Sequence, residues 1–430
     1  MKNDKKGFKP YLGLTFLIGF GFFTMGLMDP LYDTYVPIFL GRYVSSMTVV
    51  GLIMTLDNIF ALFLIPLSSV ISDRTRTGIG RRMPFIITLL PLTAVFFGSL
   101  PYAAEISLGA LVALIFGLNV VKQSVRGPVV ALMPDLIPAE YRSEANGVIN
   151  TMGGVATIVG TIGLARLMDI DIVLPLLGRT KDRLPFPLAG LLVVVAVILL
   201  FTLVKEKKQD GDGAAEKKVP ILASLKAIAG QADKSAFFIL ISLFLWFLGY
   251  QGVLPFIGKY SLDVLGTSSG TAALAAGMVG VAYAIFALPS GYVAHRKGRK
   301  KTIRTSLLVI VGLTILLFFH DPLSAGLSAS LRLYSFWLIM FAFGMFWVSI
   351  VTNSFPMLWQ MASWGTMGIY TGLYYTASQG AAILAPVLTG AIIDLAGYRG
   401  IFLFCSACML AAFFVMGKVK SGEPTKKIEE

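Results

Sequence analysis

Twelve long apolar runs dominate this chain of 430 residues and restrict its fold more than any other feature. A helix needs about 20 apolar residues to cross the hydrocarbon core of a bilayer. Runs of this kind lie at 11–40, 47–71, 84–104, 107–133, 145–168, 185–204, 236–258, 270–294, 304–320, 331–357, 367–395 and 400–417. They are too long and too continuously apolar for the strands of a membrane barrel. The sequence therefore predicts an all-α membrane protein with twelve transmembrane helices.

The composition excludes several other classes of protein. Charged side chains make up 14% of the chain and hydrophobic ones 56%, whereas soluble domains carry about 25% charged residues. A soluble enzyme, a nucleic-acid reader and a disordered chain are therefore excluded as first interpretations. The basic stretch 1–9 resembles the start of a secretory leader, but the apolar run after it is far too long and lacks a small-residue cleavage site. We expect a retained first helix.

The basic residues predict the orientation in the membrane. With the N-terminus inside, 26 of the 36 Lys and Arg residues lie in cytoplasmic segments, 8 lie outside and 2 lie within the membrane. This asymmetry predicts that both termini are cytoplasmic. We expect the chain to reside in the plasma (inner) membrane. It also accounts for the net charge of +13 without a nucleic-acid partner. We expect a functional monomer in the lipid bilayer.

Two halves of six runs flank a polar segment at residues 205–235, which we interpret as a cytoplasmic linker with a short amphipathic helix near 221–229. The predicted bundles are residues 1–204 and 236–430.

The two halves also repeat one another. "SSVISDRTRTGIGRRMPF" follows the second run and "SGYVAHRKGRKKTI" follows the eighth. In the fifth and eleventh runs, Gly147 and Thr151 match Gly372 and Thr376. A duplicated six-helix unit, giving two pseudo-symmetric bundles, explains these matches. Such duplication is typical of secondary transporters, whose substrate site lies between the halves near mid-membrane.

The loop after the second run resembles a known signature. "SDRTRTGIGRRMPF" is similar to Gly-x-x-x-Asp-Arg-x-Gly-Arg-Arg of the major facilitator superfamily. Its longer form, together with "RGPVVALMPDLIPAEYRSEANG", resembles the sucrose and disaccharide proton symporters and, more distantly, the glycoside-pentoside-hexuronide cation symporters. Ser69 stands where the signature begins with Gly. Ala61 and Ile65 stand where the last family has two carboxylates, so a proton is a better expectation than sodium.

Polar side chains inside the predicted spans are candidate functional groups, because a charge at mid-bilayer is costly. Asp29 and Asp33 lie four residues apart and share one face of a helix. Asp57 lies in the second run. The fourth run contains a polar stripe with spacings of three and four, made by Asn119, Lys122, Gln123 and Arg126.

The resemblance implies that the first and fourth helices of each half line the cavity, so that Asp29 and Asp33 lie across from Arg126. A guanidinium donates hydrogen bonds to sugar hydroxyls, and a carboxylate accepts them and can also take up a proton. We hypothesise that Asp33 or Asp29 alternates between protonation and pairing with Arg126, with Asp57 as a further proton carrier. The alternatives are a permanent ion pair or charges near the outer interface. Lys122 either binds substrate or neutralises an aspartate.

Two prolines in the first run, Pro30 and Pro37, are expected to unwind or bend that helix and free backbone carbonyls.

The second half offers aromatic rings and amides rather than charges. Rings stack on sugar faces and amides satisfy hydroxyls, which suits a neutral polyol. The alternative is an aromatic belt at the membrane interface. The substrate-binding candidates are Tyr250, Gln251, Asn353, Tyr375 and Gln379.

A cytoplasmic latch is the further role that the resemblance implies. The gating candidates are Asp73, Arg74, Arg81, Arg82, Asp135 and Arg142, with Glu140 beside the last two. Plain positive-inside anchoring is the alternative for the arginines but does not explain Asp73.

The sequence thus predicts a transporter that imports a sugar, a disaccharide or glucoside, with a proton by alternating access. We expect no cofactor and no enzymatic activity, because no phosphate-binding loop and no metal-ligand cluster occurs. Cys405 and Cys408 are expected to be structural. The alternatives are an exporter of drugs or amphiphiles from the same superfamily and a membrane sugar sensor that does not transport.

Overall fold

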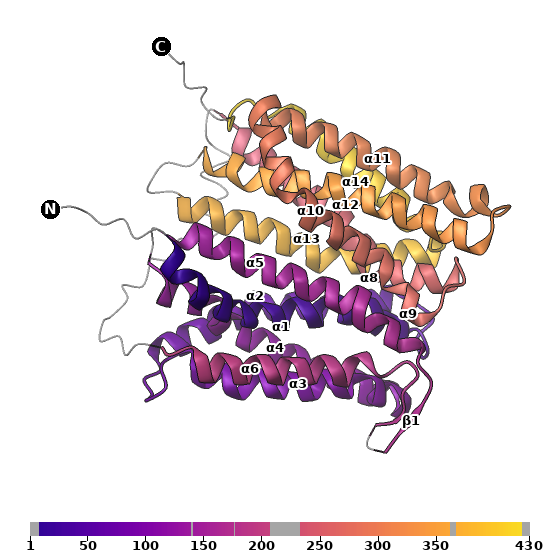
Figure 1. Cartoon of the computed structure of the whole chain (residues 1–430). Helices are drawn as coiled ribbons and strands as arrows, with labels where there is room; N and C mark the ends of the chain where they lie inside the picture. The colour runs from indigo at the N-terminus through magenta and orange to yellow at the C-terminus, as the bar shows by residue number, and fades with distance from the viewer. Residues whose placement is uncertain (1–7, 139–140, 176, 207–232, 362–366, 424–430) are drawn as a thin grey trace, which may run out of the picture. The chain divides into compact units, whose positions relative to one another are not determined.

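The computed structural model describes residues 8–138, 141–175, 177–206, 233–361 and 367–423. Within these residues, twelve helices are long and apolar enough to cross a membrane. Figure 1 shows them as long, roughly aligned rods within each part of the chain. They confirm the predicted all-α membrane fold. The helix expected near 221–229 lies outside the described residues.

The chain divides into two compact units. Unit 1 comprises Met1–Tyr43, Leu56–Asp212 and Thr267–Gly277. Its elements are α1 (Lys9–Leu40), most of α2 (Met47–Arg74), α3 (Met83–Ile106), α4 (Leu108–Leu136), α5 (Arg142–Ile158), η2 (Val159–Leu164), η3 (Ala165–Asp169), β1 (Val173–Leu174), β2 (Gly178–Arg179), α6 (Pro185–Leu203) and α9 (Ser269–Ala272). The fifth span is continuous through α5, the π-helical turn η2 and the 3₁₀ turn η3. The two short strands pair antiparallel as a small hairpin before α6.

Unit 2 comprises Val44–Thr55, Gly213–Gly266 and Met278–Glu430. It holds the first turns of α2 and the second set of long helices. These are α8 (Ser235–Asp263), α10 (Leu274–Lys297), α11 (Arg299–Ser324), α12 (Ala329–Trp359), α13 (Met367–Ala396) and α14 (Gly400–Gly417). The first residues of α10 group with unit 1.

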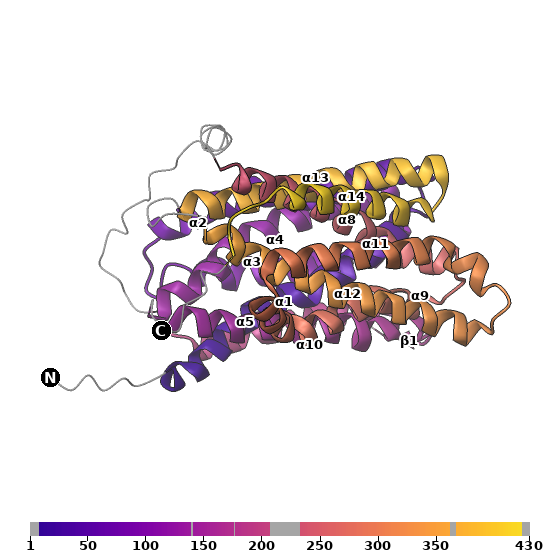
Figure 2. The same ribbon diagram turned by 90° about the horizontal axis from the view of Figure 1, so that it is seen from above.

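Both units use the same packing pattern. In unit 1, α1 packs along α5, and α3 packs along α4 and α6. In unit 2, α8 packs along α13, and α11 packs along α12 and α14. Figure 2 shows α8, α13 and α14 running side by side. The first helix of each set therefore packs on the fifth, and the third on the fourth and sixth, as expected for two copies of one unit.

The prolines of α1 do not unwind the helix, contrary to that part of the prediction. α1 is helical from Lys9 to Leu40 with Pro30 and Pro37 inside it. Pro30 has no N–H to donate to the carbonyl of Gly26. The Thr157 hydroxyl of α5 donates to that oxygen instead, at 3.2 Å. A neighbouring helix thus satisfies the acceptor that the proline leaves free, and the backbone stays helical.

Candidate functional site in the membrane spans

Lys122 on α4 is the centre of a buried charged cluster in unit 1. Only 4% of this residue is exposed. Its Nζ lies 3.0 Å from Asp29 Oδ1 on α1 and 3.2 Å from Asp57 Oδ1 on α2. Lys122 Nζ also lies 4.8 Å from the centre of the Tyr32 ring. Three helices thus place two carboxylates and one aromatic face around a single ammonium group, which compensates its burial.

The amides of the polar stripe extend this cluster. Gln123 donates to Asp57 Oδ1, and Asn119 Nδ2 donates to the Tyr32 hydroxyl at 2.9 Å. Both amide side chains are fully buried. Their carbonyl oxygens, Asn119 Oδ1 and Gln123 Oε1, have no hydrogen-bond partner within the described part of the chain. The cluster therefore holds two buried carbonyl oxygens whose capacity to accept hydrogen bonds is not used by any described residue.

Arg126 is not the partner of Asp29 in this structure, although the sequence suggested that pairing. Within the described residues, neither Arg126 nor Asp33 forms a hydrogen bond or an ion pair. The reason lies in the opposite directions of α1 and α4, which are the first and fourth of consecutive spans. Lys122 lies at the same depth as Asp29. Asp33 and Arg126 each follow these residues by four positions, which is about one helical turn, or roughly 5.4 Å along the helix axis. Asp33 and Arg126 are therefore displaced toward opposite ends of the span.

Tyr250, one of the two aromatic candidates of unit 2, belongs to a stacked group of rings. The Tyr250 ring on α8 lies parallel to the Trp347 ring on α12, with ring centres 3.9 Å apart and an interplanar angle of 6°. Phe247 packs edge-on against Trp347 at 5.4 Å. Tyr250 also stacks on Phe343 at 6.1 Å. This group presents flat apolar faces on two packed helices.

The remaining candidates of unit 2 differ in their surroundings. Gln251 and Gln379 are half-buried and form no hydrogen bond with a described residue. Asn353 is buried and donates to the Ser349 carbonyl of its own helix at 2.8 Å, and it lines a cavity of about 250 Å³. Tyr375 is 58% exposed. The two glutamines thus differ from Asn353, because neither side-chain amide forms a hydrogen bond with a described residue.

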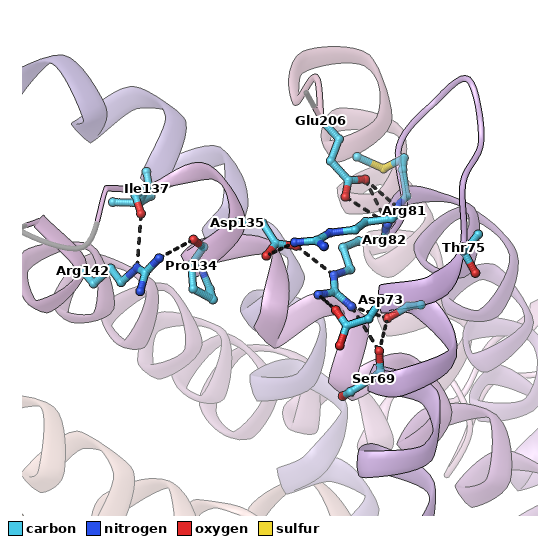
Figure 3. A network of polar contacts seen from close by, with 12 residues as sticks. Ser69, Asp73, Thr75, Arg81, Arg82, Pro134, Asp135, Ile137, Arg142 and Glu206 are labelled. Atoms are coloured by element: carbon cyan, nitrogen blue, oxygen red, sulfur yellow. Dashed lines mark hydrogen bonds and ion pairs between the residues drawn. The ribbon is translucent and has the colours of Figure 1, made fainter. Parts of the chain in front are cut away.

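The gating candidates form a dense network at one end of unit 1, shown in Figure 3. Arg82 is buried, and it pairs with Asp73 on α2 and, through Nε at 2.9 Å, with Asp135 on α4. Arg81 also binds Asp135, with contacts of 2.6 and 3.1 Å. Arg82 further donates to the Ser69 carbonyl and the Ser72 hydroxyl. One guanidinium thus joins α2, the following loop and α4 by charge-assisted hydrogen bonds.

Two of the predicted gating residues lie outside this network. Arg142 donates to the carbonyls of Pro134, at 2.8 Å, and Ile137, at 3.3 Å, so it stabilises the end of α4. Arg74 is exposed and forms no ion pair with a described residue. Glu140 lies outside the described residues.

Glu206, just after α6, completes the network and was missed by the sequence analysis. Its carboxylate accepts from the backbone N–H groups of Arg82, at 3.0 and 3.1 Å, and Met83, at 3.1 Å, at the start of α3. Gly80 permits this approach. It has a φ of +112°, and a Cβ there would lie 2.1 Å from Glu206 Oε2. Glu206 could not be found from the loop alone, because it is more than 120 residues away in sequence.

Unit 2 repeats this arrangement at the matching loop, where Gly298 precedes Arg299 and Lys300 as Gly80 precedes Arg81 and Arg82. Gly298 has a φ of +92°. The Glu423 carboxylate, after α14, accepts from the N–H groups of Arg299 and Lys300 at 2.8 and 2.7 Å. A carboxylate after the last helix of each set thus caps the third helix of that set.

A second pair of aspartates was also missed, although the internal repeat relates them. In unit 1, Asp169 at the end of η3 accepts from the Gly270 N–H at 2.9 Å and the Ser268 hydroxyl at 2.6 Å. In unit 2, Asp394 near the end of α13 accepts from the Thr48 N–H at 2.9 Å and the Ser46 hydroxyl at 2.7 Å. Each aspartate follows the matched glycine of its span by the same number of residues. The alignment of those glycines was the signal that could have identified them.

The cysteines take no part in these clusters. Cys405 and Cys408 are free and buried, and both pack near Gly249, where α14 approaches α8.

These features together define a class of protein. Twelve spans in two six-helix sets, with charged side chains inside the spans of one unit, are the architecture of a secondary transporter. The sequence matches the profile of the Major Facilitator Superfamily over residues 11–382. The chain therefore belongs to that superfamily.

Several solved structures of transporters share this fold. The nucleoside transporter NupG, in a mutant form, has a TM-score of 0.71 and 14% identity, covering 95% of this chain and 100% of its own. A bacterial homologue of the human lysosomal transporter Spinster, inward-facing and occupied, has a TM-score of 0.70 and 14% identity, covering 96% and 98%. A bacterial homologue of the iron transporter ferroportin, inward-facing, has a TM-score of 0.68 and 15% identity, covering 95% and 98%. At such identities these likenesses show the fold alone. None of the curated proteins compared with the chain matches it.

Proposed function

We propose that this transporter imports a neutral sugar, a disaccharide or glucoside, together with one proton by alternating access across the plasma membrane. The resemblance of the loop after α2 to that of the sucrose and disaccharide symporters supports the cargo. The charged cluster of unit 1 and the aromatic group of unit 2 support the chemistry.

The charge balance of the cluster is the observation that carries proton coupling. Three carboxyl groups, Asp29, Asp33 and Asp57, lie in the spans with two cations, Lys122 and Arg126. Lys122 compensates Asp29 and Asp57. One bound proton makes the whole set neutral, and neutrality lowers the cost of placing the set inside a membrane. Loading and releasing one proton per cycle follows from this balance.

Asp33 is the proposed proton carrier. It lacks a cation partner within the described residues, whereas Asp29 lies against Lys122. An ionised carboxylate inside a bilayer is costly unless it is paired. Asp33 is therefore the carboxyl group of this set that gains most from taking up a proton.

The proposed cargo contacts come from neutral groups. The free carbonyl oxygens of Asn119 and Gln123 accept hydrogen bonds from sugar hydroxyls, and the free amides of Gln251 and Gln379 both donate and accept them. The Tyr250 ring, stacked on Trp347, offers a flat apolar face for a pyranose. Lys122 holds its two carboxylates and acts on cargo only through them.

The cytoplasmic network has a proposed gating role. Arg82 joins Asp73 to Asp135, and we infer that these bonds form in one state of the cycle and separate in another. Cargo and proton shift the populations of these states through their different affinities for each.

Uptake by proteoliposomes tests the proposal. Wild-type protein should accumulate labelled sucrose or another disaccharide of a panel when the outside is acid and should not respond to a sodium gradient at constant pH. Asp33→Asn should still exchange labelled for unlabelled sugar across the membrane but should no longer accumulate it. Asp263→Asn is the matched control, because that carboxylate is 41% exposed and pairs with Lys259 one turn away on α8.

Other outcomes assign other functions. Uptake of uridine in place of sugars points to a nucleoside cargo, and expulsion of lipophilic cations points to the exporter. Sugar that raises the melting temperature but never crosses the membrane points to the sensor, because binding stabilises the folded state by mass action.

A further inference from the structure

Unit 2 has a groove whose lining residues belong neither to the charged cluster of unit 1 nor to the aromatic group of unit 2. It is formed by α10, α11 and α12 and has a volume of about 870 Å³. Near its outer end, α10 and α12 touch, since a Cβ on Gly344 would lie 2.7 Å from the Val279 carbonyl oxygen. The groove opens farther along both helices, between Phe286 and Val293 on one side and Met345 and Ser349 on the other.

The groove combines an apolar floor with a cationic rim. Phe286, Val293 and Phe346 contribute apolar side chains within the spans. Arg296 and Lys297 lie at the last turn of α10, and Lys301 lies in the first turn of α11. All three cations are exposed. By the distribution of basic residues, this rim is at the cytoplasmic end of the spans.

The three cations of the rim lack a carboxylate partner within the part of the chain that the structure describes. The nearby Glu423 is committed to the N–H groups of Arg299 and Lys300. Arg296 is held over the Tyr292 ring, with Cζ 4.5 Å from its centre, and its side chain is exposed. The rim is thus a surplus of positive charge at the level of lipid headgroups.

We propose that this groove binds an anionic phospholipid of the cytoplasmic leaflet. The phosphate lies against Arg296, Lys297 and Lys301, and an acyl chain follows the apolar floor along Phe286 and Val293. Val293 on the floor is 41% exposed, and the proposal has the occupant enter the groove from the lipid phase. Basic pockets between transmembrane helices are suited to lipid headgroups in this position. The proposal is independent of the cargo and of proton coupling.

Native mass spectrometry of the purified full chain tests this proposal. The probes are dioleoylphosphatidylglycerol and dioleoylphosphatidylcholine, titrated into detergent micelles. The wild-type chain should retain the first lipid preferentially. Each basic residue near an anionic headgroup contributes a factor of roughly five in association, so a variant with Arg296→Gln, Lys297→Gln and Lys301→Gln should bind it on the order of a hundredfold more weakly.

Two further variants separate a built site from a general effect of charge. A control with Lys2→Gln, Lys5→Gln and Lys6→Gln loses the same charge and should retain phosphatidylglycerol like the wild type. Val293→Trp keeps every cation but fills the floor, so it should also weaken binding. Both groove variants should melt like the wild type in phosphatidylcholine alone.

Three results would overturn the proposal. The first is equal retention of the two lipids by the wild type. The second is an equal loss in the N-terminal control, which would assign the effect to net charge. The third is that an excess of inorganic phosphate displaces the lipid completely, which would assign the rim to a free anion.

Discussion

Replacing Lys122 by Met should strongly destabilise the fold of unit 1. Met has a similar length and no charge, so the change removes the ammonium group and leaves Asp29 and Asp57 without the cation that lies 3.0 and 3.2 Å away. Removing one partner of a buried ion pair costs about 3–5 kcal/mol. The loss should fall in the upper part of that range, because one lysine serves two carboxylates.

Unfolding by a graded denaturant in mixed micelles measures this cost. A change of about 3–5 kcal/mol lowers the folding equilibrium constant by roughly two to four orders of magnitude. Lys259→Met is the matched control, because its pair with Asp263 lies one turn apart at the end of α8 and joins a lysine that is 13% exposed to a carboxylate that is 41% exposed. Such a pair contributes about 0–1 kcal/mol.

A double-variant cycle shows whether the carboxylate causes the effect. Lys122→Met combined with Asp29→Asn removes both charges of one pair, so its cost should be smaller than the sum of the single changes by about 1–3 kcal/mol. The reasoning is refuted if Lys122→Met is no more destabilising than Lys259→Met, or if the two single changes are additive.

Other substitutions test the caps and the network around Arg82, each by the same unfolding assay. Gly80→Ala should cost more than about 1–2 kcal/mol, since its φ of +112° strains a side chain and the new Cβ displaces the Glu206 carboxylate, whereas Gly78→Ala has open space and should be close to neutral. Arg82→Ala should cost about 3 kcal/mol because it separates α2 from α4, while Arg74→Ala, with no ion pair to a described residue, should cost under about 1 kcal/mol. Asp394→Ala removes the cap of α2 and should cost about 1–2 kcal/mol. Equal costs within either matched pair, or no cost at the cap, would contradict these assignments.

The sequence predicted the spans well, because their signal is the apolar run itself. The second run, predicted at 47–71, is α2 at Met47–Arg74. Its true end was obscured because helices extend into polar residues that carry no hydropathy signal. The eighth span shows the same effect, since α10 continues through His295, Arg296 and Lys297.

The ion-pair and hydrogen-bond partners of the polar residues were harder to predict than the positions of the spans. The resemblance to the superfamily placed Asp29 on a helix facing that of Lys122 and Arg126. Which of the two cations pairs with Asp29 depends on its depth in the membrane, and a difference of one helical turn selects Lys122. Glu206 was hidden for another reason, since it is distant in sequence from the amides that it caps. The caps at Asp169 and Asp394 were predictable in principle from the internal repeat.

Charge movement during uptake tests the central claim most directly, because a neutral sugar carries no current by itself. Proteoliposomes on a solid-supported electrode should give an inward positive current after a disaccharide jump at acid pH. The current should disappear in Asp33→Asn while sugar exchange continues. Sugar accumulation without any current, or a current that follows sodium at constant pH, would contradict an account in which one unpaired carboxyl group carries the coupling proton.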